Sequence, residues 1–84
     1  MTEENSVAAV KAYVLIGTDS SRTKDIVSQL RSIAGVSEVN EVMGPYDIVA
    51  EVQIGEMSEM TVILRQQIRA IEGVKSTVTC VAYP

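Results

Sequence analysis

The sequence predicts an α+β fold in which two helices cover one face of a four-stranded antiparallel sheet. The first observation is an internal repeat. A shift of 38 positions, which places Gly17 on Gly55, aligns about eleven identical residues over about 32 positions, where chance gives about two or three. The second observation is that each copy has the residue pattern of a strand, a helix and a strand. Two such units make a ferredoxin-like βαββαβ sandwich, and right-handed crossovers give the strand order 4-1-3-2.

The first copy covers the first two strands and the first helix. Residues 11–18 (KAYVLIGT) are rich in β-branched and aromatic residues, which predicts a strand. Asp19 or Ser20 then offers a side-chain oxygen that can cap the first amides of a helix. Apolar residues at helical spacing predict the face that this helix turns to the core: Ile26, Leu30, Ile33, Ala34. Gly35 ends the helix, because glycine readily takes the left-handed conformation, and residues 36–43 form the second strand.

The second copy repeats this scheme. Residues 47–54 (DIVAEVQI) alternate apolar and polar side chains, as expected for a strand with one buried face. Ser58 is the candidate cap of the second helix, Gly73 ends it, and residues 74–83 form the last strand. The apolar stripe of this helix is expected to comprise four residues: Met60, Leu64, Ile68, Ile71. Three further apolar residues, Met57, Val62 and Ile63, indicate either a second contact or a small core that uses them all.

Length and composition limit the class of protein. A chain of 84 residues is expected to form one domain, residues 1–84, with a core at about 11–82. Its net charge of −4 and the lack of a basic stripe argue against direct binding of nucleic acid. No apolar run reaches the roughly 18 to 20 residues of a membrane span. An acidic N-terminus without a signal-peptide pattern and a single cysteine fit a cytoplasmic protein.

The face of the sheet that the helices leave open is predicted to be half apolar. Its expected apolar positions are Tyr13, Leu15, Val49 and, as a further candidate, Val81. The polar residues interleaved with them are Lys11, Glu51, Gln53, Thr77, Thr79. A half-apolar open face favours docking, and we expect a homodimer interface that includes Tyr13, Leu15, Val49 and Glu51. The alternative is that the terminal segments fold over this face.

The residues that usually carry catalysis or cofactors are missing from the sequence. There is no histidine, so the commonest general base and metal ligand is absent. We interpret Cys80 as a residue packed in the core, because no basic neighbour would turn its thiol into a thiolate. No Cys-x-x-Cys pair and no glycine-rich phosphate loop occurs. We therefore expect a protein that is not an enzyme, with no metal and no cofactor.

The most unusual stretch is Gly44-Pro45-Tyr46-Asp47, at the junction of the two copies. One interpretation is a turn, with Asp47 closing it through a bond to a backbone amide. The other is a site in which Asp47 holds an ammonium group while backbone amides and threonine hydroxyls hold a carboxylate, a combination that suits an amino acid. Thr77 and Thr79 are candidates for these hydroxyls, although two β-formers on the open face would look the same.

In these residues the chain resembles the effector-binding (RAM) domain of the Lrp/AsnC family of transcriptional regulators. The resemblance covers about Ala12 to Ala82 and rests on two stretches, AGVSEVNEVMGPYDIVAEV and IEGVKSTVTCV. It implies a domain that dimerises through its sheet, dimers that assemble into octamer-like rings, and an amino acid or similar small effector bound between dimers. It also implies effector contacts by Gly44, Tyr46 and Asp47, with Thr77 and Thr79 near them.

The chain departs from full-length members of that family at its N-terminus. About ten residues precede the first strand, which is too few for a helix-turn-helix, so we expect a stand-alone domain with no DNA-binding domain. The first hypothesis is a non-enzymatic, oligomeric amino-acid sensor. A stand-alone domain of this family is expected to bind an amino acid, to co-assemble with a full-length regulator, or to do both. The alternatives are a pure assembly module without ligand, an ACT-like regulatory domain and a small ferredoxin-like enzyme.

Overall fold

The computed structural model describes residues 10–83, so the N-terminal stretch used above to predict location and the absence of a leader lies outside the described residues. Along the chain the elements are β2 (Val10–Thr18), a 3-10 turn (Ser20–Arg22), α1 (Thr23–Arg31), β3 (Val36–Glu41), β4 (Ile48–Ile54), α2 (Met57–Val62), the π-helical η2 (Ile63–Ile68) and β5 (Val74–Val81). This order is the predicted βαββαβ sequence of elements.

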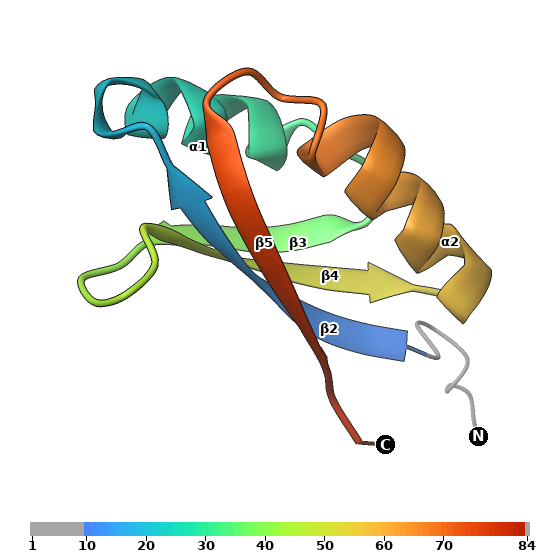
Figure 1. The fold of residues 1–84 in the computed structure, drawn as a ribbon. Helices are drawn as coiled ribbons and strands as arrows, with labels where there is room; N and C mark the ends of the chain where they lie inside the picture. Colours follow the sequence, from blue (N-terminus) through green and yellow to red (C-terminus); the bar gives the residue numbers. More distant parts are fainter. Residues whose placement is uncertain (1–9, 84) are drawn as a thin grey trace.

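The four strands form one antiparallel sheet in the order β3-β4-β2-β5, which confirms the predicted order. Both helices lie on the same face of this sheet, as Figure 1 shows. The core lies between the helices and the sheet, and its fully buried large side chains are Ile16, Ile26, Leu30, Ile48, Ile68, Val14, Val52. The alternation in β4 is as predicted, because Ile48, Ala50, Val52 and Ile54 are all buried.

The side chains of β5 point to the faces opposite to those predicted. Directly opposed residues of an antiparallel pair point to the same face, and here Thr77 opposes Ile16 while Thr79 opposes Val14. Ile16 and Val14 are buried under the helices, so Thr77 and Thr79 lie on the helix side and not on the open face. Val81, opposite Ala12, does the same.

The open-face positions of β5 are occupied by Val78 and Cys80 instead. These two residues oppose Leu15 and Tyr13. Cys80 is exposed, so the expectation that it packs in the core is wrong. The pattern TVTCV has apolar or small residues at every position, and period-two alternation therefore could not decide its orientation.

The second helix differs from the first by one extra residue in its middle. Its buried residues are Met60, Ile63, Ile68 and Ile71, whereas Leu64 is only half-buried. The amide of Arg69 donates to the carbonyl of Leu64, five residues earlier, over 2.8 Å, which is the bond of a π turn. This turn lets Ile63 and Ile68 share a face, and it explains why a regular 3.6-residue period predicted Leu64 and not Ile63.

Among residues 10–83, no helix is long and apolar enough to cross a membrane. Within the same stretch, no group of three or more Cys, Asp or Glu side chains could hold a metal ion.

Candidate functional site

The turn between β3 and β4 is closed by the backbone. The amide of Val42 donates to the carbonyl of Asp47 over 2.9 Å. Gly44 has a φ of +147°, which a residue with a side chain rarely adopts, and it is exposed with no atom within 4 Å of the place of a Cβ. The Asp47 side chain is therefore not needed to close its own turn.

The carboxylate of Asp47 instead holds the end of β2. Its Oδ2 accepts the amide N–H of Thr18 at 2.8 Å and the Thr18 hydroxyl at 3.3 Å. The Thr18 hydroxyl also lies 2.7 Å from that of Thr23, at the start of α1. Asp47 thus joins the β3–β4 turn to the β2–α1 connection. Within residues 10–83, all hydrogen bonds found for this carboxylate end on Oδ2, so Oδ1 can accept a further donor.

A hollow of about 500 Å³ adjoins Asp47. It is lined by the β2–α1 connection, the first turn of α1 and the end of the β3–β4 hairpin: Ser20, Ser21, Thr23, Lys24, Glu41, Val42, Asp47. The hollow therefore presents carboxylates on one side and an ammonium with hydroxyls on the other. Such an arrangement can bind a small molecule that carries both an ammonium and a carboxylate.

The five predicted effector residues divide into two groups. Gly44, Tyr46 and Asp47 lie together at the turn, where Tyr46 and Asp47 are half-buried and Gly44 is exposed. Thr77 and Thr79 lie on β5, which is separated from β4 by β2. Thr77 lines a different hollow, of about 450 Å³, with Arg69, Val74, Lys75 and Ser76. Among residues 10–83, no hollow is found that the threonines and Asp47 line together.

The predicted interface residues do share the open face of the sheet. Tyr13 opposes Glu51, and Leu15 opposes Val49. Tyr13 is 37% exposed, and Val78, on the neighbouring strand, is 42% exposed. Together with Cys80, these residues form an open-face patch, which we define as Tyr13, Leu15, Val49, Glu51, Val78, Cys80.

A polar cluster borders this patch. The Gln53 amide donates to the Glu51 carboxylate over 2.6 Å, and Lys11 lies 3.7 Å from the same carboxylate. The Gln53 hydrogen bond and then the charge of Lys11 lower the pKa of Glu51, against the opposing effect of burial. Glu51 therefore stays ionised within the open-face patch, next to its apolar members.

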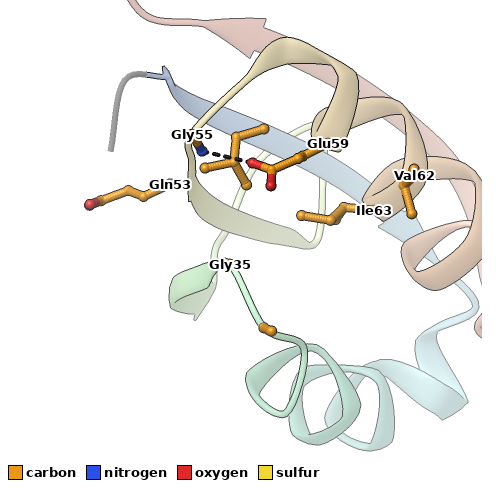
Figure 2. A pocket seen from close by; sticks show the side chains of 8 residues that line it. Gly35, Gln53, Gly55, Glu59, Val62 and Ile63 are labelled. Atoms are coloured by element: carbon orange, nitrogen blue, oxygen red, sulfur yellow. Dashed lines mark hydrogen bonds between the residues drawn. The ribbon is translucent and has the colours of Figure 1, made fainter. Parts of the chain in front are cut away.

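Two features escaped the sequence analysis. Lys24 is the cation of the Asp47 hollow, and no local pattern links a surface lysine to a distant turn. The other feature is a second hollow of about 460 Å³ at the opposite end of the β3–β4 hairpin, drawn in Figure 2. It depends on the π turn and on backbone packing, which no local pattern signals.

Comparison with known proteins places these observations in a family. The model of the Lrp/AsnC ligand binding domain matches residues 11–83. A solved protein of Thermus thermophilus is 33% identical, covers 89% of this chain and 94% of its own, and superposes with a TM-score of 0.87.

Two further relatives are larger proteins. A homocitrate synthase of Saccharolobus solfataricus is 38% identical over 71 residues, which are 83% of this chain and 15% of the synthase. The chain thus spans about 15% of the length of the curated relatives it matches. A transcriptional regulator of Neisseria meningitidis, solved as a complex with L-Met, is 12% identical and has a TM-score of 0.87 over 100% of this chain and 56% of its own. At that identity the likeness shows the fold alone.

Proposed function

The chain belongs to the family of Lrp/AsnC ligand-binding domains, and from this membership we propose that it is a non-enzymatic sensor of a free amino acid or a similar small zwitterion. The observation that carries the proposal is the hollow beside Asp47, where groups of both charges lie within one small volume. The L-Met complex of the Neisseria regulator supports an amino acid as the effector.

In the proposed mode of binding, the effector ammonium donates to Oδ1 of Asp47 and to Glu41. The effector carboxylate lies toward Lys24 and the hydroxyl of Ser20. Asp47 suits this role because Thr18 already fixes its Oδ2, so the free oxygen is held in one position before the ligand arrives. Binding to a group that is already ordered avoids part of the entropic cost of association.

The assembly we propose is a homodimer through the open-face patch, with dimers joining into a ring. Exposed apolar side chains at Tyr13 and Val78 support the dimer, because water would otherwise cover them. A ring would also explain how Thr77 and Thr79 contribute to the site, since another copy could bring them to the Asp47 of this chain. Co-assembly with full-length Lrp/AsnC regulators would then make the effector a signal for transcription.

Thermal unfolding with each of the twenty amino acids tests the sensor. A ligand at about ten times its Kd stabilises the native state by about 1.4 kcal/mol, which raises the Tm of a domain of this size by about 6–11 °C. The variant Asp47→Asn keeps an oxygen for the Thr18 amide but loses the charge, and we expect it to fold and to lose this rise.

Asp25→Asn is the matched control, because it makes the same chemical change on the exposed surface of α1, where Asp25 accepts from Gln29. We expect it to keep the full ligand-induced rise in Tm. An unchanged response in Asp47→Asn, or no response of the natural chain to any amino acid at millimolar concentration, would contradict the proposed site.

A second candidate function is an assembly module without a ligand. The observation that favours it is that Asp47 already has a structural partner in Thr18. The homocitrate synthase match also shows that a region similar to this one occurs within an enzyme chain. Under this alternative Asp47→Asn leaves the mass of the oligomer and its partner binding unchanged, and no amino acid alters either of them.

A further inference from the structure

The second hollow lies at the far end of the β3–β4 hairpin from Asp47. Its walls come from the loop before β3, the end of β4, and the second helix: Ala34, Gly35, Gln53, Ile54, Gly55, Glu59, Val62, Ile63. Figure 2 shows Glu59 and Ile63 on the helix side and Gly35 on the loop opposite them. The surface is mostly apolar, and Glu59 supplies its charge.

The equivalent place at the first helix, where that helix packs on the loop after the second helix, shows a different filling. Gly73, which matches Gly35 in the repeat, is covered by the side chain of Arg22. A Cβ built on Gly73 would lie 2.9 Å from Cβ of Arg22 and 3.1 Å from Cδ1 of Ile26. The guanidinium of Arg22 then reaches Glu72, with 3.1 Å between Nη2 and Oε2. An apolar stem thus rests on the glycine and a cation rests on the carboxylate.

The hollow at the second helix also has a glycine and an isoleucine, but it lacks the arginine. A Cβ built on Gly35 would lie 3.0 Å from Cδ1 of Ile63. Four residues before this isoleucine stands Glu59, in the place that Arg22 holds four residues before Ile26. Ala34 stands where the second copy has Glu72. The residue equivalent to Arg22 is therefore an acid. Over Gly35 lie Cδ1 of Ile63 and Cγ2 of Ile54, at 3.0 and 3.3 Å from the place of a Cβ, so the cover of this glycine is apolar and carries no cation.

The side chain of Glu59 turns away from Gly35. Its Oε1 accepts the amide N–H groups of Gly55 at 2.8 Å and Glu56 at 3.2 Å, as one half of a capping box. Among residues 10–83, these hydrogen bonds all end on Oε1, so Oε2 can accept a donor from the hollow. The hollow consequently combines mostly apolar walls with a free carboxylate oxygen, and no salt bridge to this oxygen is found among residues 10–83.

We propose that this hollow binds an alkylguanidinium or alkylammonium group. The alkyl stem packs against the side chains of Ile54 and Ile63, which cover Gly35, and the cation donates to Oε2 of Glu59. The proposal does not depend on the Asp47 site, because the two hollows share no residue and lie at opposite ends of the hairpin. The packing of Arg22 on Gly73 and its ion pair with Glu72 provide the comparison, because there the chain itself supplies an alkyl stem and a cation.

Titration with butylguanidinium, followed by the amide NMR signals of the five glycines, tests the proposal directly. Gly35 and Gly55 line the hollow. Gly44 reports on the Asp47 turn, and Gly73 reports on the contact with Arg22. We expect shifts at Gly35 and Gly55 that saturate, and none at Gly44. Butylurea has the same shape without the charge, and we expect it to bind about tenfold more weakly, the loss of about one charge-assisted hydrogen bond.

Variants separate the charge from the fold. Glu59→Gln keeps an oxygen acceptor for the capping box and should fold, but we expect about tenfold weaker binding of butylguanidinium. Glu72→Gln changes the net charge equally without touching the hollow and should bind like the natural chain. Ala34→Glu places a carboxylate at the position equivalent to Glu72, and we expect binding to become several-fold tighter.

The source of the cation is decided by two further probes. Free L-arginine and blocked N-acetyl-arginine N-methylamide share the side chain, but only the first represents a free amino acid. Tighter binding of L-arginine indicates a metabolite, and equal or tighter binding of the blocked form indicates an arginine side chain of a protein. The proposal is wrong if butylurea binds as well as butylguanidinium, if Glu59→Gln binds unchanged, or if the shifts occur at Gly44 instead of Gly35 and Gly55.

Discussion

The two copies differ in the spacing between the glycine at the strand end and the isoleucine that packs on the glycine after the other helix. In the first copy Ile26, which contacts Gly73, lies nine positions after Gly17. In the second copy Ile63, which contacts Gly35, lies eight positions after Gly55. The first copy uses its additional residue in the 3-10 turn before α1. The second regains it in the π turn, where Ile63 and Ile68 are five apart while Ile26 and Leu30 are four apart. A repeat that aligns without a gap therefore contains two compensating shifts, and equivalent positions in the sequence are not equivalent in the helices.

The copies also differ in how the ends of their central strands are held. At the end of β2, Thr18 donates to Asp47, which is 29 residues away. At the end of β4, Gly55 donates to Glu59, which is four residues away. The first arrangement ties three elements together, whereas the second is local. The hollow beside Asp47 is therefore positioned by segments far apart in the sequence, whereas the hollow beside Glu59 adjoins a local helix cap.

The largest expected difference between the two helices is in the cost of deleting one exposed residue, measured as the free energy of unfolding. Removing Ser28 from α1 rotates Leu30, a fully buried residue, by about 100° away from the core and should cost at least about 3 kcal/mol in the free energy of unfolding. Removing Gln66 from the π turn brings Ile63 and Ile68 to α-helical spacing and should cost less than about 1 kcal/mol. Urea unfolding measures both.

This pair of deletions has a clear contrary outcome. If the π turn were required for the packing of the second helix, the loss of Gln66 would destabilise the protein as much as the loss of Ser28. Equal costs would therefore refute the one-residue shift described above.

Removing the two strand-end carboxylates should sharpen the comparison. Asp47→Ala leaves the half-buried amide of Thr18 without its acceptor and should lower the free energy of unfolding by about 1–3 kcal/mol. Glu59→Ala removes part of an exposed cap and should cost about 1 kcal/mol or less. Chemical denaturation gives both values. Asp47→Asn and Glu59→Gln keep an acceptor oxygen and should recover most of each loss, whereas a greater cost for Glu59→Ala than for Asp47→Ala would reverse the assignment.

The smallest effect concerns acid stability and the cap of the first copy. The Ser21 amide and then the Ser21 hydroxyl lower the pKa of Asp19, so the native state favours its ionised form. The resulting stabilisation is present above the unfolded-state pKa of about 3.9 and is lost as the pH falls through the lower folded-state value. Asp19→Asn should remove this part of the acid-induced loss. Unfolding curves between about pH 2 and 5 measure it, and identical pH profiles for both chains would contradict it.

Most of the fold was predictable because it depends on local patterns. Alternation in β4 and the glycines that end both helices specified strands and helices from local patterns, and the 38-residue repeat with right-handed crossovers predicted the strand order. The orientation of β5 was not predictable, because Thr77, Val78, Thr79 and Cys80 differ little in their preference for a buried face. The π turn was missed because a regular helical period assigns Leu64 to the core.

The candidate site was predictable only in its turn. Gly44 and Asp47 stand out in the sequence, and they do lie at one end of the hairpin, where Asp47 lines a hollow. The partner of Asp47 could not be inferred, because Thr18 is 29 residues away and donates through its backbone amide, which carries no residue-specific signal. Lys24 joins the same hollow through the packing of α1 against the hairpin end, which depends on the complete fold.

The orientation of β5 gives the chain a built-in chemical probe. Its only thiol lies on the open sheet face beside Tyr13, so a thiol reagent reports the solvent access of that face without any engineered substitution. The rate of modification at Cys80, followed against protein concentration, would trace the covering of the patch by another molecule as a kinetic footprint. A label fixed there would in turn be a steric block on the same surface.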